Sequence, residues 1–274
     1  MTFKRFLRII HVGIDALLRL PYINWFNPLM TLYVNFRSFP FRQAIRIPMF
    51  VYGWPKLFSL LGKMECKDIC KTGMIKFNQT NIGAPSNPGS NTSINNWGTI
   101  IFHGPCLIYT ANQINTHRYG ILELGANTKI MHHVNITAHC QVFVGANTRI
   151  THRCQILDSN FHYMADFKKG VVRKYSRPIY IGKSCWICNT SSVTGGAKIP
   201  DCTIVASNSL VNKDFSDIPP ESIIGGVPAK LVSTGYRRIN NENLERKIGK
   251  YFAEHPEANE YLLGEEFNHD ECDG

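Results

Sequence analysis

His162 is the residue in this sequence whose type and surroundings best suit it for proton transfer. It lies in the segment 156–163, ILDSNFHY, with Asp158 four residues before it. An imidazole can act as a general base near neutral pH, and could remove the proton of a hydroxyl that attacks an acyl group. Asp158 could orient that imidazole or bind a substrate hydroxyl, as the carboxylate of a triad does. The structural alternatives are an ordinary surface histidine and an aspartate that stabilises a turn.

The nine cysteines offer a second kind of reactive chemistry, and Cys185 and Cys188 form a CxxC pair. Cys185, however, takes the fifth place of a six-residue repeat, as Cys140 and Cys154 do, and that place requires a small side chain. We therefore interpret these cysteines as core residues. The odd number and the absence of a disulfide spacing indicate a reducing compartment.

The elements that must position these residues are hexapeptide repeats. From Ile181 the chain reads IGKSCW, ICNTSS, VTGGAK, IPDCTI, VASNSL and VNKDFS, so an aliphatic residue recurs every six residues. This period fits neither a lone helix nor a hairpin. It predicts a prism-shaped parallel β-helix in which three repeats make one coil and the aliphatic residues point inward.

An earlier block from Leu124 shows the same repeat with two additional residues, Val142 and Phe143, which we interpret as an extension at a corner. A polar, basic and aromatic excursion leaves the repeats over about 162–178. Such a loop on a rigid scaffold is a common place for binding chemistry, and a passive insertion is the alternative. The predicted division is 1–76, a basic and partly helical region; 77–234, the β-helix; and 235–274, a helix near 242–252 with a frayed acidic tail from Glu265.

The net charge of +10 is concentrated in the first 80 residues, where 12 basic residues face 3 acidic ones. Apolar residues at helical spacing predict an amphipathic helix that ends near Pro21. It could lie on a membrane surface, or pack on the β-helix or a neighbouring subunit. Because no apolar run is long enough to span a bilayer and no signal-peptide cleavage site follows, we predict a cytoplasmic protein with peripheral membrane contact as an open alternative.

Taken together, these motifs resemble the hexapeptide-repeat acyltransferases, and within them the bacterial envelope-polysaccharide O-acetyltransferases. The most specific segments are ILDSNFHY at 156–163, PIYIGKSCWIC at 178–188, NSLVNKDF at 208–215 and IIGGVPAKLV at 223–232. The segment NPLMTLYVNFRSFPFRQAI at 27–45 also resembles the N-terminal region of the bacterial subgroup. The resemblance implies an all-β fold, a left-handed parallel β-helix with short N- and C-terminal helices. It also implies a homotrimer with active sites between subunits.

The resemblance further implies acetyl-CoA as co-substrate and His162 as the general base, with Asp158 as its partner. It gives Asn189 and Ser207 backbone N–H groups for the thioester, Trp186 a place beside the acyl-transfer site, and Lys213 and Lys230 contacts with the phosphates of coenzyme A. Two departures stand out: Cys188 replaces a common glycine, and Asn160 replaces a common acidic residue.

The predicted function is transfer of an acetyl group to a hydroxyl of a sugar in a surface polysaccharide or its precursor, with no nucleic-acid partner. The alternatives are a sugar N-acyltransferase of the same fold and a non-catalytic scaffold. A further alternative is a zinc site built from His132, His139 and His152, because one carbonic anhydrase class has this fold. The spacing differs from that class, so we predict no metal.

Overall fold

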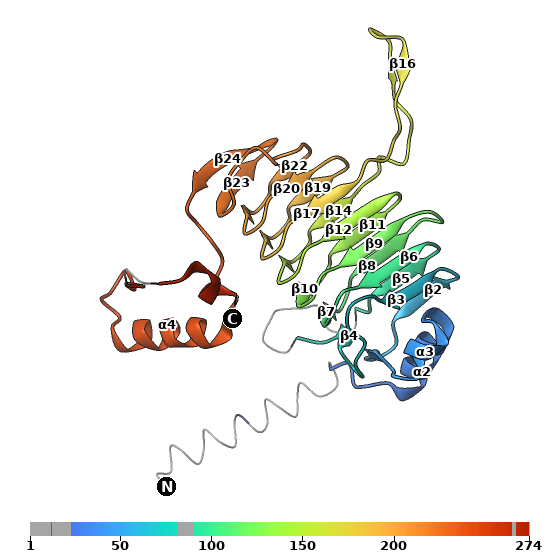
Figure 1. Cartoon of the computed structure of the whole chain (residues 1–274), viewed down its shortest axis with the longest axis horizontal. Coiled ribbons are helices and arrows are strands. Elements are labelled where there is room, and N and C mark those ends of the chain that lie inside the picture. Colours follow the sequence, from blue (N-terminus) through green and yellow to red (C-terminus); the bar gives the residue numbers. More distant parts are fainter. Residues whose placement is uncertain (1–11, 13–22, 82–89, 265–266, 274) are drawn as a thin grey trace.

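The computed structural model describes residues 12, 23–81, 90–264 and 267–273, and most of them form a parallel β-helix with three sheets (Figure 1). The first sheet contains β1 (Met49–Val51), β4 (Ile75–Gln79), β7 (Cys106–Tyr109), β10 (Thr128–Ile130), β13 (Arg149–Ile150), β18 (Trp186–Ile187), β21 (Ile204–Val205), β23 (Ser222–Gly226) and β24 (Ala229–Thr234). The second contains β2 (Lys56–Leu60), β5 (Ser93–Asn96), β8 (Gln113–Thr116), β11 (Asn135–Ala138), β14 (Gln155–Leu157), β19 (Ser192–Thr194) and β22 (Leu210–Val211). The third contains β3 (Lys63–Cys66), β6 (Thr99–Phe102), β9 (Ile121–Leu124), β12 (Gln141–Val144), β17 (Ile179–Ile181) and β20 (Lys198–Ile199).

The aliphatic residues of the repeat fill the interior of this prism. Ile181, Ile187 and Val193 are fully buried, and they pair in register with Val144, Ile150 and Ile156 of the preceding coil. Among the fifth-place residues, Cys185, Ser191 and Ala197 are also fully buried. The predicted all-β fold, a left-handed parallel β-helix of hexapeptide coils with short terminal helices, is confirmed.

Two details of the prediction were wrong. The first coil begins at Met49 in β1, so residues 49–76 belong to the β-helix and not to a separate N-terminal region. Val142 and Phe143 do not extend a corner: they lie within β12 and pair regularly with β9 and β17. Val142 and Val144 are both fully buried, because a longer strand turns two side chains inward on this side of the prism.

Short helices flank the β-helix at each end. At the N-terminal end α2 (Pro28–Ser38) and α3 (Phe41–Ala44) pack beside the first coil (Figure 1). The amphipathic helix predicted before Pro21 lies outside the described residues. None of the helices in the described part of the chain has the length and apolar character that crossing a membrane requires.

The C-terminal segment leaves the β-helix after β24 and returns toward the first sheet. Helix α4 (Glu242–Glu254) begins at an Asn241 cap, and a 3-10 helix follows at His269–Cys272. The side chain of Arg237 bonds to carboxylates of Asp273 and Glu221, and the Asn240 amide donates to the Cys272 carbonyl at 2.6 Å. The prediction of a frayed tail was therefore wrong for residues 267–273, because ion pairs and backbone bonds hold them against the chain.

His132 lies inside the corner between the first and second sheets and is fully buried. Its Nδ1 lies 2.8 Å from the Thr110 hydroxyl, and its ring stacks on His152 with 5.4 Å between centroids. Burial, with repulsion from His152, lowers the pKa of His132 to about 4.

Acid should therefore destabilise the protein through His132. Below about pH 6.5 the unfolded chain binds a proton at this histidine that the folded chain does not, so stability falls as the pH drops toward 4. The full effect is roughly 3 kcal/mol of unfolding free energy. Urea denaturation between pH 7 and 4.5 should show a smaller loss for His132→Phe than for the wild type. His255→Phe, at an exposed position, is the control, and equal losses in all three proteins would contradict the assignment.

Candidate active site

His162 lies where the chain leaves the second sheet after β14 and enters the excursion, which continues as the hairpin of β15 (Ala165–Asp166) and β16 (Val171–Val172). The hairpin projects away from the prism (Figure 1). Its base is closed by backbone bonds from Asn160 N to Tyr175 O at 2.9 Å and from Arg177 N to Asp158 O at 2.8 Å. The His162 side chain is exposed. An exposed imidazole on a clamped backbone suits a base that must reach a second molecule.

A stack of rings supports the base of the excursion beside His162. Tyr163 and Tyr175 meet edge to face at 4.7 Å between centroids, and Tyr175 packs against His139 at 4.9 Å. His139 in turn stacks on His117, with 4.0 Å between ring centroids. Burial, and to a smaller extent charge repulsion from His117, lowers the pKa of His139. The sequence prediction did not include His117 and Tyr175. The repeat could have revealed the two histidines as neighbours: His117 and His139 directly follow Thr116 and Ala138, which pair with each other in adjacent coils.

Asp158 is fully buried and its carboxylate binds backbone amides. Oδ1 accepts from His139 N at 2.7 Å, and Oδ2 accepts from Cys140 N at 2.7 Å and Gln141 N at 2.8 Å. Within the described residues His162 forms no hydrogen bond or ion pair, with Asp158 or any other group. The contacts favour the turn-stabilising alternative: Asp158 fixes the corner on which the ring stack rests.

Trp186 lies in β18 of the first sheet, on a different side of the prism from His162. The guanidinium of Arg238 covers its ring at 4.9 Å, and its Nε1 is buried without a hydrogen-bond partner in the part of the chain that the structure describes. Burial, with repulsion from Arg149, lowers the pKa of Arg238 to about 10. Two arginines and an unpaired N–H donor therefore converge near Trp186, an arrangement that favours an anionic or strongly polar ligand.

Asn189 and Ser207 occupy the corner between the first and second sheets, in consecutive coils. Both residues are exposed, and neither backbone amide donates a hydrogen bond within the described ranges. The next residues link the coils, since Asn208 N donates to Asn189 O at 3.1 Å. Two free N–H groups on adjacent coils are suitably placed donors for an oxyanion.

The two lysines lie apart from each other. Lys213 is exposed near the corner between the second and third sheets, with its Nζ 4.9 Å from the centre of the Phe215 ring. Lys230 is exposed in β24, on the first sheet. The structure thus divides the predicted site into two groups: His162, Asp158 and Lys213 along one corner, and Trp186, Asn189, Ser207 and Lys230 on and beside the first sheet. The first sheet is the side opposite that corner, so one chain does not bring the two groups together.

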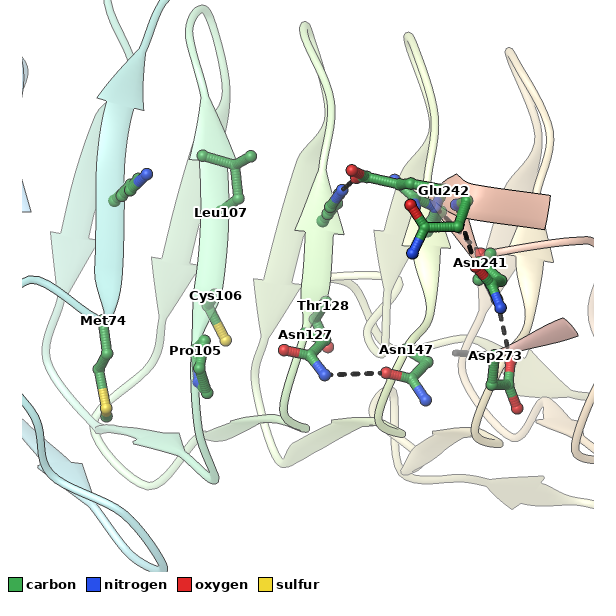
Figure 2. Close-up of a pocket in the computed structure, with 15 residues that line it drawn as sticks. Met74, Pro105, Cys106, Leu107, Asn127, Thr128, Asn147, Asn241, Glu242 and Asp273 are labelled. Atoms are coloured by element: carbon green, nitrogen blue, oxygen red, sulfur yellow. Dashed lines mark hydrogen bonds and ion pairs between the residues drawn. The ribbon is translucent and has the colours of Figure 1, made fainter. Parts of the chain in front are cut away.

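A polar cleft of about 510 Å³ lies between the outer face of the first sheet and the C-terminal segment (Figure 2). Its lining includes Lys76, Lys129 and Arg149, which stand in register on the first sheet, and Trp186 is the next residue in that row. Lys129 pairs with Glu242 at 3.2 Å, and Arg149 Nε donates to Asn240 Oδ1 at 3.1 Å. The sequence prediction missed this cleft, because one of its walls comes from residues 240–243 and 273.

The three histidines of the zinc alternative do not converge. His132 and His152 stack at the corner between the first and second sheets, whereas His139 lies at the corner between the second and third. Among the described residues no group of three or more His, Cys, Asp and Glu side chains is arranged to hold a metal ion.

Comparison with known proteins gives similarity to acetyltransferases. No family model matches the chain. It is 32% identical over 80 residues to galactoside O-acetyltransferase of Escherichia coli (strain K12), covering 29% of this chain and 36% of that protein. It is 38% identical over 64 residues to chloramphenicol acetyltransferase of Morganella morganii, covering 23% of this chain and 28% of that protein. The chain thus spans about a third of the length of these relatives.

Among solved structures, the polySia-specific acetyltransferase NeuO matches with a TM-score of 0.45 and 17% identity, over 76% of this chain and 99% of that one.

Proposed function

The chain resembles the hexapeptide-repeat acyltransferases, and from this premise we propose that it is an acetyl-CoA-dependent O-acetyltransferase that acts on a sugar hydroxyl of a surface polysaccharide or its precursor. One observation carries the proposal. His162 is exposed at the clamped base of the excursion, whereas the donors that an acyl transfer needs lie on other parts of the prism: Trp186 on the first sheet, and Asn189 and Ser207 at the corner between the first and second sheets.

The proposed reaction is direct transfer. The acceptor hydroxyl gives its proton to the His162 imidazole as its oxygen bonds to the thioester carbonyl carbon. The amides of Asn189 and Ser207 bind the negative charge that develops on the carbonyl oxygen. The carbon–sulfur bond then breaks, and the coenzyme A thiolate leaves and takes up a proton from the imidazolium. No covalent intermediate on the enzyme is required.

We propose a homotrimer because the two groups of residues lie on different parts of the prism surface within one chain. A second copy packed beside the first can place its excursion, with His162, against the first sheet of its neighbour. The active site then forms between subunits, with coenzyme A held near Trp186 and against Lys213 and Lys230, and the sugar acceptor in the cleft of Figure 2. Such a cyclic arrangement repeats one interface around a closed ring.

Release of free coenzyme A from acetyl-CoA, measured with a panel of sugars and oligosaccharides, tests the proposal. Each hydroxyl acceptor should be paired with the corresponding amino sugar. Faster turnover of the amino sugars would favour N-acyl transfer. Binding of acetyl-CoA without turnover of any acceptor would leave the protein a scaffold and overturn the proposal.

The proposed role of the cleft in binding the acceptor leads to a separate prediction. Arg149→Ala removes a cationic donor from the row that leads to Trp186, and a hydrogen bond from a charged group contributes about 1.5 kcal/mol. We expect the KM for the acceptor to rise about tenfold with a smaller change in kcat. Arg246→Ala, an exposed arginine on α4, is the control. An increase in the KM for acetyl-CoA alone would assign the cleft to the coenzyme and not to the acceptor.

A further inference from the structure

Helix α2 is amphipathic in the opposite sense to a usual surface helix. Its buried side is mostly polar: Thr31, Asn35 and Ser38 are buried together with Val34. Thr31 and Asn35 bind the backbone of β1, the edge strand of the first sheet. Val51 N donates to Thr31 Oγ1 at 3.0 Å, and Asn35 Nδ2 donates to Met49 O at 2.7 Å. The polar side of the helix therefore covers the exposed edge of β1 and satisfies backbone groups that would otherwise be left unpaired there.

The apolar side of α2 consequently faces outward. Leu29 is 71% exposed, and Phe41 at the start of α3 is 72% exposed. The rings of Phe36 and Phe41 lie 6.4 Å apart, so the two helices contribute to one surface. We call this surface the cap face; it consists of the exposed residues Leu29, Leu32, Tyr33, Phe36, Phe41 and Ile45. A contiguous apolar surface of this kind marks a contact with another molecule or with a membrane.

The charged residues of the two helices that form the cap face are all positive. Arg37, Arg42 and Arg46 are exposed on and beside the same two helices, and residues 23–46 contain no aspartate or glutamate. Aromatic rings flanked by arginines are typical of surfaces that lie at the boundary between lipid headgroups and acyl chains. Each basic residue near an anionic bilayer adds to the attraction.

Charge also decides between the occupants of this face. The preceding residues 1–22 carry Lys4, Arg5, Arg8 and Arg19 against Asp15, so they would be repelled by the arginines of the cap face. A symmetric contact between two copies would bring the same arginines together. An anionic lipid surface is complementary to both the apolar and the basic residues.

We propose that the cap face docks the protein on an anionic lipid bilayer, with the apolar side chains of α2 and α3 in the headgroup region and the arginines on lipid phosphates. The inference is independent of the acyl-transfer proposal. In such an orientation the axis of the β-helix points away from the membrane, because α2 and α3 lie at one end of it (Figure 1).

Co-sedimentation of the full chain with vesicles tests this docking. The wild type should sediment with vesicles of phosphatidylcholine mixed with phosphatidylglycerol, and far less with phosphatidylcholine alone. Leu32→Ser with Phe36→Ser should lower the partition coefficient at least tenfold. Arg37→Glu with Arg42→Glu should abolish the preference for anionic vesicles. All four positions are exposed, so we expect the melting temperature to stay unchanged.

Leu231→Ser with Leu262→Ser is the matched control, because these leucines are exposed in the C-terminal part of the chain. It should sediment like the wild type. Equal sedimentation of the wild type and the Leu32 and Phe36 variant would overturn the proposal. So would a change of molar mass in light scattering without any change in lipid binding, which would assign the cap face to a contact between copies.

Discussion

Acyl transfer by the His162→Ala variant is expected to fall by a factor between about 10² and 10⁴, which is the usual contribution of a general base. The loss should appear in kcat, because the imidazole acts on the proton only as the acceptor oxygen attacks. The KM values for both substrates should change little. Since the side chain is exposed and makes no polar contact within the described residues, the variant should unfold at the temperature of the wild type.

Coenzyme A release, measured beside circular dichroism melting, gives both quantities. His255→Ala replaces another exposed histidine, outside the proposed site, and should keep full activity. If His162→Ala retained full activity, His162 would not be the base, and the ring stack of His139 and Tyr175 would position nothing of catalytic importance.

Asp158→Ala is expected to reduce the free energy of unfolding by roughly 3–5 kcal/mol, because it removes the acceptor of three backbone amides and leaves them unpaired. Asp158→Asn should cost less, since its amide keeps one acceptor oxygen. Urea denaturation at pH 7 measures both changes.

Activity per folded molecule then separates the structural role of Asp158 from a catalytic one. We expect Asp158→Asn to retain substantial activity under conditions in which the variant is folded. The reason is that the wild-type Asp158 carboxylate binds the backbone of residues 139–141 and does not bind the His162 imidazole. A variant as stable as the wild type but as inactive as His162→Ala would restore Asp158 as the partner of the base.

The middle and the end of the β-helix could be predicted from the sequence because each inward position carries the same kind of residue. Ile181, Ile187 and Val193 recur at six-residue intervals, so the coil geometry can be predicted from residues that are close together in the sequence. The coils before residue 77 were missed for the converse reason. The buried positions of the first coil hold Met49, Met64 and Cys66, and the pairing of β2 with β5 shifts in register between Leu57 and Ser59, so the six-residue aliphatic period is interrupted although the strands pair.

The sequence by itself determined the kind of fold, the position of the excursion and the identity of its histidine, because these depend on residues close together along the chain. Only the tertiary structure decided how the candidate residues meet. It showed His162 and Trp186 on opposite sides of the prism, the Asp158 carboxylate bound to backbone amides, and α2 with its polar side inward. These features depend on which strand edge, corner or returning segment each side chain faces, and contacts between distant segments leave no period in the sequence.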